Sequence, residues 1–158
     1  RAESDPIPHV VARDERSAAF MADVYSRLTG KPGVCEGPSG GGATYMLPGV
    51  VEAHGSSVSL IALTTDNAIS YEAQGALTAL DQPQLFATVT KWAARVKNAE
   101  MLPRFVRRAF RTSTSGRPGA VHLSLPKDVL GQEIASHIRV YAEDACTSWP
   151  AYRARRPA

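Results

Sequence analysis

The alternation of short apolar runs with longer stretches of helical periodicity constrains the fold of this chain more than any other feature. The clearest run is residues 58–64, V-S-L-I-A-L-T, which lacks sustained polar alternation and is expected to be a central, fully buried strand. Such runs, separated by helices, are typical of a parallel sheet covered on both faces. We therefore predict an α/β fold, a doubly wound parallel sheet of about five strands with helices on both faces. The expected strands are residues 8–12, 33–36, 58–64, 85–90 and 120–125.

Three segments have the periodicity of helices. Residues 15–28 follow Asp14, a residue type that caps helix N-termini, and Gly30 ends the pattern. The other two helices are expected at residues 43–54 and 100–112. The chain opens almost directly on its first expected strand, with no helix before it, so an N-terminal βα unit could be missing.

A glycine-rich loop joins the second expected strand to the second helix. Residues 33–45 read G-V-C-E-G-P-S-G-G-G-A-T-Y, an apolar run followed by a loop and the start of a helix. In open α/β sheets, loops at the carboxyl ends of strands form ligand sites, and glycines allow close approach to a ligand. The loop by itself is compatible with a generic turn or a phosphate cradle, although it contains no GxGxxG and no Walker lysine follows it.

Composition narrows the possible functions. The chain has 158 residues, 44% hydrophobic and 21% charged, and a net charge of +3, an ordinary profile for a globular domain. Its arginine clusters are too sparse for a nucleic-acid surface, and no apolar run approaches the ~18 residues of a membrane span. Cys35 and Cys146 lie far apart, which argues against a zinc site or a disulfide framework. We therefore expect no nucleic-acid or membrane partner and a reducing, cytoplasmic location.

Four motifs in order carry a resemblance to a known family. They are residues 13–34 (R-D-E-R-S-A-A-F-M-A-D-V-Y-S-R-L-T-G-K-P-G-V), 39–44 (S-G-G-G-A-T), 89–92 (V-T-K-W), and 115–129 (S-G-R-P-G-A-V-H-L-S-L-P-K-D-V). Together they resemble the N-terminal, pyrimidine-binding domain of thiamine diphosphate enzymes of the acetolactate synthase and 2-oxoacid decarboxylase group. The resemblance assigns residues 1–130 to this domain. Residues 131–158 are then a linker toward a central domain absent here, since W-P-A-Y at 149–152 resembles the family's linker.

The resemblance gives Glu15 a catalytic meaning. In the family, a glutamate at the matching position hydrogen-bonds N1′ of the aminopyrimidine, and the 4′-nitrogen then takes the C2 proton of the thiazolium. Position alone also allows a structural interpretation, in which Glu15 is an acid stabilised by the helix dipole. The residues expected to border the aminopyrimidine are Ser39, Gly40, Gly41, Gly42 and Tyr45.

The family also implies how the cofactor is shared between domains. This chain is expected to bind only the pyrimidine half of thiamine diphosphate, while magnesium and the diphosphate belong to an absent domain. No metal site is assigned to this chain. The parent enzyme is expected to act on a 2-oxoacid and to be a homodimer or higher homo-oligomer, and the isolated chain is expected to be inactive.

Several positions depart from the family pattern. They are Asp14, Pro38, Gly41, Tyr45 and the stretch 77–79, L-T-A, where the family has F-Q-E. These departures indicate either a divergent substrate or a degenerate, non-catalytic α/β module kept for oligomer or partner contacts. The retention of Glu15 favours the enzyme.

Overall fold

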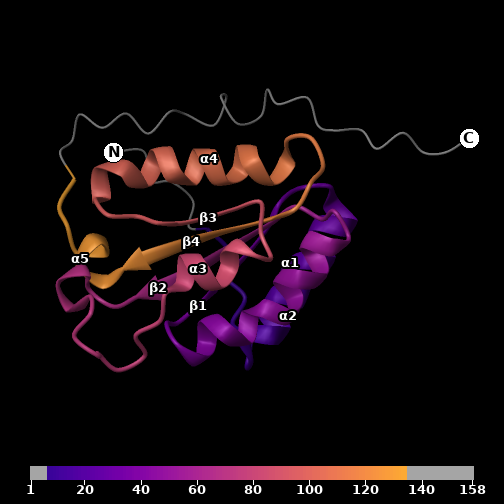
Figure 1. Cartoon of the computed structure of the whole chain (residues 1–158). Coiled ribbons are helices and arrows are strands. Elements are labelled where there is room, and N and C mark those ends of the chain that lie inside the picture. Colours follow the sequence, from indigo (N-terminus) through magenta and orange to yellow (C-terminus); the bar gives the residue numbers. More distant parts are fainter. Residues whose placement is uncertain (1–6, 135–158) are drawn as a thin grey trace, which may run out of the picture.

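A computed structural model of the chain describes residues 7–134, which form an open α/β sandwich with helices on both sides of one sheet (Figure 1). Its sheet has four parallel strands in the order β1-β2-β4-β3. The strands are β1 (Gly33–Gly37), β2 (Leu60–Asp66), β3 (Trp92–Arg95) and β4 (Ala120–Pro126). The predicted parallel sheet is therefore confirmed, and all four carboxyl ends lie at the same edge.

Helices cover both faces of the sheet, as predicted (Figure 1). On one face lie α1 (Glu15–Thr29), α2 (Gly41–Gly55) and α3 (Gln82–Ala87), and α4 (Leu102–Thr114) covers the other face. The short helices η1 (Ile69–Tyr71), η2 (Ala99–Met101) and α5 (Lys127–Leu130) lie within the connections and after β4.

The core is divided between the two faces of β2 and β4. Leu60 and Ala62 point toward α2 and α3, while Ile61 points toward α4. Ile61 is only 2% exposed, because β2 has a strand on each side and helices on both faces. This confirms the prediction of a central, buried strand, although the strand begins and ends two residues later than expected.

Small residues allow α1 to approach its neighbours closely. A Cβ atom added at Gly49 of α2 would lie 2.6 Å from the Cβ atom of Ala19. A Cβ atom added at Gly33 would lie 2.0 Å from the carbonyl oxygen of Ala22. These separations are shorter than any real contact, so the two glycines set how tightly α1 packs on α2 and β1.

Two basic residues of the recognised motifs cap helices. The Nζ atom of Lys91 donates hydrogen bonds to the carbonyl oxygens of Thr112 and Ser115 at the end of α4. Arg117 donates to the carbonyl oxygen of Gly55, at 2.9 Å, at the end of α2. Cations at helix C-termini satisfy free carbonyls and favour the helix dipole. These two side chains therefore hold the fold together from the edge opposite the strands' carboxyl ends.

The strand predicted at residues 8–12 is wrong. Residues 7–12 have no regular structure, and Val10 and Val11 are 77% and 93% exposed. A strand forms only when a neighbour pairs with it, and none of the described strands lies beside this segment. The described sheet accordingly has four strands rather than five.

The strand predicted at residues 85–90 is also wrong. Asp81 caps a helix there by accepting a hydrogen bond from the amide of Gln84, and Pro83 occupies the first turn. These start signals for a helix outweigh the apolar run that follows. The strand of this region is β3, which begins at Trp92. Of the linker predicted at 131–158, residues 135–158 lie outside the described residues.

Candidate functional site

The carboxylate of Glu15 lies against the glycine loop. Its Oε1 atom is 3.1 Å from the position of a Cβ atom added at Gly42, and its Cγ atom is 3.4 Å from that of one added at Gly37. Glu15 begins α1, and Asp14 caps that helix by accepting a 2.8 Å hydrogen bond from the amide of Arg16. Within residues 7–134, no group hydrogen-bonds to the Glu15 carboxylate, so its oxygens are available as acceptors.

The structural elements that position Glu15 differ from those predicted. The strand expected at residues 8–12 would have ended just before Glu15, but no strand precedes Glu15 among the described residues. The packing of α1 against β1 and α2 positions it instead, through the close approaches at Gly33 and Gly49. Glu15 and the glycine loop thus lie in direct contact.

The loop after β1 uses its glycines for distinct reasons. Gly40 has a φ of +66°, and an added Cβ atom would lie 2.7 Å from the Cβ atom of Thr78. An added Cβ atom at Gly42 would lie 2.4 Å from the Cγ atom of Pro38, whereas one at Gly41 would meet nothing within 4 Å. Neighbouring side chains therefore leave no room for a Cβ atom at Gly40 and Gly42, whereas Gly41 has open space beside it.

Ser39 and Tyr45 complete the predicted set. The hydroxyl group of Ser39 lies 2.8 Å from that of Thr78. Tyr45 is 55% exposed on the first turns of α2, and its ring centre lies 5.7 Å from the guanidinium carbon of Arg16. The structure thus places the predicted residues in one region where α1, the loop and α2 meet.

In the sequence, residues 77–79 stand out only as a departure from the family pattern. The structure places Thr78 on the glycine loop, where it contacts Gly40 and Ser39. Thr78 has a φ of 62°, which is strained for a β-branched residue. A hydrogen bond of 3.0 Å from Asn67 Nδ2 to the carbonyl oxygen of Leu77 ties the segment to the end of β2.

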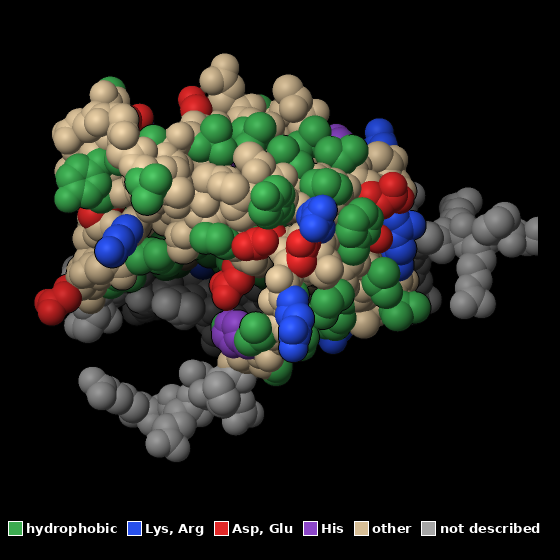
Figure 2. Space-filling model, turned by 90° about the horizontal axis from the view of Figure 1, so that it is seen from below, with side chains coloured by type: hydrophobic (Ala, Val, Ile, Leu, Met, Phe, Trp, Pro, Cys, Tyr) green, Lys and Arg blue, Asp and Glu red, His purple; other side chains and the backbone are tan. Residues whose placement is uncertain are grey.

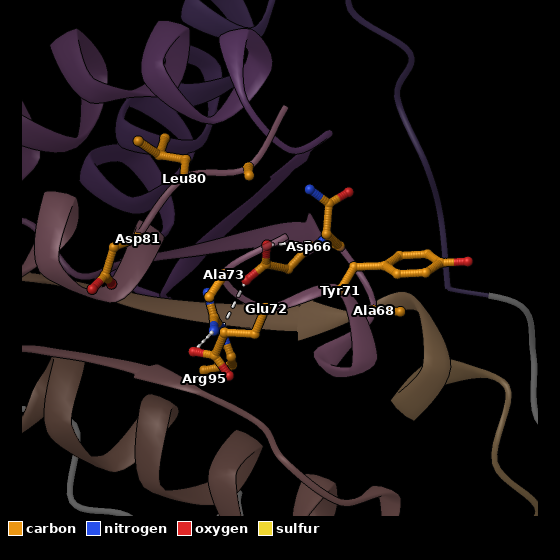
Figure 3. Close-up of a pocket in the computed structure, with 10 residues that line it drawn as sticks. Asp66, Ala68, Tyr71, Glu72, Ala73, Leu80, Asp81 and Arg95 are labelled. Carbon is orange, nitrogen blue, oxygen red and sulfur yellow. Dashed lines mark hydrogen bonds and ion pairs between the residues drawn. The ribbon is translucent and has the colours of Figure 1, made fainter. Parts of the chain in front are cut away.

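A cavity of about 300 Å³ opens on the other side of this segment (Figure 3). Asp66 ends β2, Arg95 ends β3, and both side chains line the cavity. Arg95 bridges Asp66 and Glu72, with nitrogen–oxygen distances of 2.9 and 3.1 Å. This site was not predicted from the sequence. The only signal there is a charged residue, Asp66 or Arg95, at the end of each of two apolar runs.

Two titratable side chains in the core have pKa values far from their usual range. Burial lowers the pKa of His122 to about 3, and its ring stacks on Phe86 with centroids 3.8 Å apart. Burial raises the pKa of the Cys35 thiol to about 12. His122 is therefore neutral and Cys35 protonated at pH 7, and both act as core residues.

Comparison with known proteins decides the family. Residues 1–85, just over half of the chain, match the family described as thiamine pyrophosphate enzyme, N-terminal TPP binding domain. The chain belongs to this family. The resemblance seen in the sequence motifs is thereby confirmed, and the glycine loop, Glu15 and Thr78 all lie within the matched residues.

Similar proteins include two kinds of enzyme. A probable acetolactate synthase large subunit of Methanocaldococcus jannaschii is 38% identical over 145 residues, 92% of this chain and 24% of that protein. A probable 2-ketoarginine decarboxylase AruI of Pseudomonas aeruginosa is 36% identical over 154 residues, 96% of this chain and 26% of that protein. The acetolactate synthase isozyme 1 large subunit of Escherichia coli is 37% identical over 127 residues, 80% of this chain and 23% of that protein. The chain thus spans about a quarter of the length of these relatives.

No helix within residues 7–134 is both long and apolar enough to cross a membrane. The same residues contain no group of three or more His, Cys, Asp or Glu side chains arranged to hold a metal ion.

Proposed function

We propose that this domain binds the aminopyrimidine of thiamine diphosphate in a parent enzyme that acts on 2-oxoacids, as an acetolactate synthase-like lyase or transferase. The observation that carries the proposal is the position of Glu15. No described group hydrogen-bonds to its carboxylate. The carboxylate lies against the backbone of the glycine loop, closest to Gly42.

The residues present suit a flat heteroaromatic ring. Gly41 leaves open space beside the loop backbone, because a Cβ atom added there would meet nothing within 4 Å, whereas Met46, Thr78 and Pro38 already pack against Gly37, Gly40 and Gly42. Glu15 supplies an acceptor at one side of that space, and Ser39 supplies a hydroxyl that Thr78 orients. The aromatic ring of Tyr45 is 55% exposed on the first turns of α2.

When bound, thiamine diphosphate supplies an electron sink for cleavage of a bond next to a carbonyl group. The task of Glu15 is to hold a proton on a ring nitrogen of the aminopyrimidine. A carboxylate does this well when water is excluded, because its charge then favours the protonated ring more strongly. The side chains of Ser39, Thr78 and Tyr45 orient the ring and limit access of water.

The rest of the cofactor site belongs to other parts of the parent protein in this proposal. Residues 1–130 form the pyrimidine-binding domain, and 131–158 lead to a central domain. The diphosphate and magnesium are held by a further domain, supplied by a second subunit of a homodimer or higher oligomer. The relatives are named as acetolactate synthases and a 2-ketoarginine decarboxylase, which supports a 2-oxoacid as the substrate.

Exposed hydrophobic residues support such an assembly. The outer face of α1 and the adjoining part of α2 leave large apolar side chains in solvent, and Figure 2 shows hydrophobic side chains exposed on this side of the molecule. Patches of this kind mark subunit contacts. The residues are Phe20, Met21, Val24, Tyr25, Leu28, Tyr45 and Val51.

The second candidate is a non-catalytic module kept for partner contacts. Gly41 and Tyr45 in the loop, and the 89% exposed Leu77, favour it because they replace the residues that the family pattern has there. The free Glu15 carboxylate favours the enzyme.

The test uses the full-length parent protein with thiamine diphosphate and magnesium, assayed against a panel of 2-oxoacids. Glu15→Gln should lower the rate roughly 30- to 1000-fold, because an amide cannot stabilise a protonated ring nitrogen and one charge-assisted hydrogen bond of ~2–4 kcal/mol is lost. Glu100→Gln, the same change at an exposed position away from the loop, is the control. Full activity in the Glu15→Gln enzyme would exclude the proposed role, and absence of cofactor binding by the wild-type parent would favour the non-catalytic module.

A further inference from the structure

The cavity beside Arg95 lies where the strand order of the sheet reverses. After β2 the chain crosses the face that carries α3, skips one strand position and forms β3 at the edge of the sheet. It then returns through α4 on the opposite face and forms β4 between β2 and β3. The loops after β2 and β3 therefore leave the sheet toward different faces. A crevice at the carboxyl end of the strand between them is the usual ligand position in an open parallel sheet.

Asp66 holds Arg95 in place at this crevice. The Oδ2 atom of Asp66 lies 2.9 Å from Nε of Arg95 and accepts a 2.6 Å hydrogen bond from Ser124 Oγ. The Oδ1 atom accepts a 2.8 Å hydrogen bond from the amide of Asn67. The Asp66 side chain is only 3% exposed, so its charge holds the inner side of the guanidinium as an ion pair, although Arg95 Nε has no hydrogen-bond partner within the described residues.

Glu72 occupies the outer end of the same guanidinium. Its Oε1 atom lies 3.1 Å from Nη1 of Arg95, and its side chain is 67% exposed. Glu72 follows η1 in the loop over the cavity, and Figure 3 shows its side chain beside that of Arg95. An ion pair this exposed contributes little, so moving Glu72 into solvent is easy.

We infer that this cavity binds a small organic carboxylate, which takes the place of Glu72 on the outer fork of Arg95. A guanidinium fork matches a carboxylate bidentately, and here a carboxylate of the protein already marks the position. A volume of about 300 Å³ is at the lower end of the range for small-molecule sites, and the side chains of Ala73, Ala79 and Leu80 give it an apolar wall.

A cationic ligand fits the arrangement less well, although the lining contains three carboxylates. Asp66 has its oxygens committed to Arg95, Ser124 and Asn67. Asp81 caps α3 through the amide of Gln84. Glu72 and the second oxygen of Asp81 would then be left to receive a cation, and Glu72 would have to leave Arg95 to do so.

The site is distinct from the one formed by Glu15 and the glycine loop, although a single segment borders both. Thr78 contacts Gly40, whereas the next three residues, 79–81, line the cavity. Neither Glu15 nor the cofactor takes part in this carboxylate binding, so a failure to bind carboxylates would leave the proposed function untouched.

The experiment is a titration of the 158-residue chain with pyruvate, and separately with propionate, followed by the NMR shifts of the Arg95 Nε–H group and of the amides of residues 66–81. Both probes should bind. Glu72→Gln should tighten binding roughly two- to fivefold, the factor that corresponds to losing an exposed competing ion pair. Glu100→Gln changes the net charge equally and should leave the affinity unchanged. Arg95→Lys keeps the charge opposite Asp66 but loses the fork, and should weaken binding at least tenfold.

The two probes separate the sources of the carboxylate. Preference for pyruvate over propionate assigns the site to a 2-oxoacid, and equal binding assigns it to carboxylates in general. Unchanged or weaker pyruvate binding in the Glu72→Gln chain would overturn the inference, as would equal tightening in the Glu100→Gln control. Binding of methylguanidinium that depends on Glu72, without binding of pyruvate, would also overturn it.

Discussion

The hydroxyl groups of Ser39 and Thr78 lie 2.8 Å apart and join two loops that are 39 residues apart in the sequence. One loop follows β1 and carries the glycines, and the other follows β2 and covers the cavity of Arg95. The contact fixes the wall of the proposed pyrimidine site from the side opposite α1. It also places the strained backbone of Thr78 at the boundary between the two sites.

Substitutions at Thr78 should separate its hydrogen bond from its strain. Thr78→Ala loses the bond and keeps a side chain at positive φ, so the free energy of unfolding should fall by about 0.5–1.5 kcal/mol. Thr78→Gly also loses the bond but relieves the strain, and should be more stable than the alanine variant by about 0.5–1 kcal/mol. Urea unfolding measures both. If the alanine variant is the more stable of the two, the positive φ of Thr78 carries no strain.

Gly42→Ala should distort the site from within. The new methyl group would lie 2.4 Å from Pro38 and 3.1 Å from Glu15 Oε1, so the loop and the carboxylate must move. We expect a loss of about 1–3 kcal/mol in the free energy of unfolding and weaker cofactor binding by the parent enzyme. Gly41→Ala is the matched control, because its methyl group meets nothing within 4 Å. Equal stability of the two variants in urea would show that the close packing around Gly42 is unimportant.

Lys91→Met should weaken the end of α4. The substitution keeps an apolar stem but removes the hydrogen bonds to the carbonyl oxygens of Thr112 and Ser115. We expect the free energy of unfolding to fall by about 1–2 kcal/mol. Lys97→Met, at an exposed position, is the control, and thermal unfolding of both variants is the measurement. A loss no larger than that of the control would mean that Lys91 contributes only an exposed charge.

His122 should make the domain sensitive to acid. Its pKa is about 3 in the folded chain, below its ordinary value of 6.5, so the unfolded chain binds the extra proton first as the pH falls. The stabilisation that comes from keeping the ring neutral is fully present above pH 6.5. Between pH 6.5 and 3, the free energy of unfolding should fall by about 1.4 kcal/mol per pH unit. The groups packed on the ring, Thr64 and Phe86, do not titrate in this range.

Comparison with His122→Gln isolates this contribution. Urea unfolding of both chains at pH 7, 6 and 5 should give a shallower dependence on pH for the variant. Parallel dependences would show that other groups, such as His54, whose pKa burial also lowers, account for the acid sensitivity.

Local patterns in the sequence were enough to predict much of the fold. The run at residues 58–64 identified the central strand, because a strand buried on both faces needs apolar side chains on both. Asp14 and Gly30 identified the ends of α1, because caps act through their own backbone neighbours. The motif around Glu15 and the glycine loop also predicted that these residues lie together, and in the structure they are in direct contact.

Other features depended on partners that a local pattern does not contain. Residues 8–12 have the composition of a strand but lack a described neighbour to pair with, and residues 85–90 became helical because Asp81 and Pro83 start a helix before the apolar run can extend. The contact of Thr78 with Ser39, and the bridge of Arg95 to Asp66, join residues 39 and 29 positions apart. The sequence by itself determined which segments can form strands and helices and where the cofactor motif lies. Only the tertiary structure decided which loops meet at the carboxyl edge, because the strand order sets those contacts and each involves residues far apart in the chain.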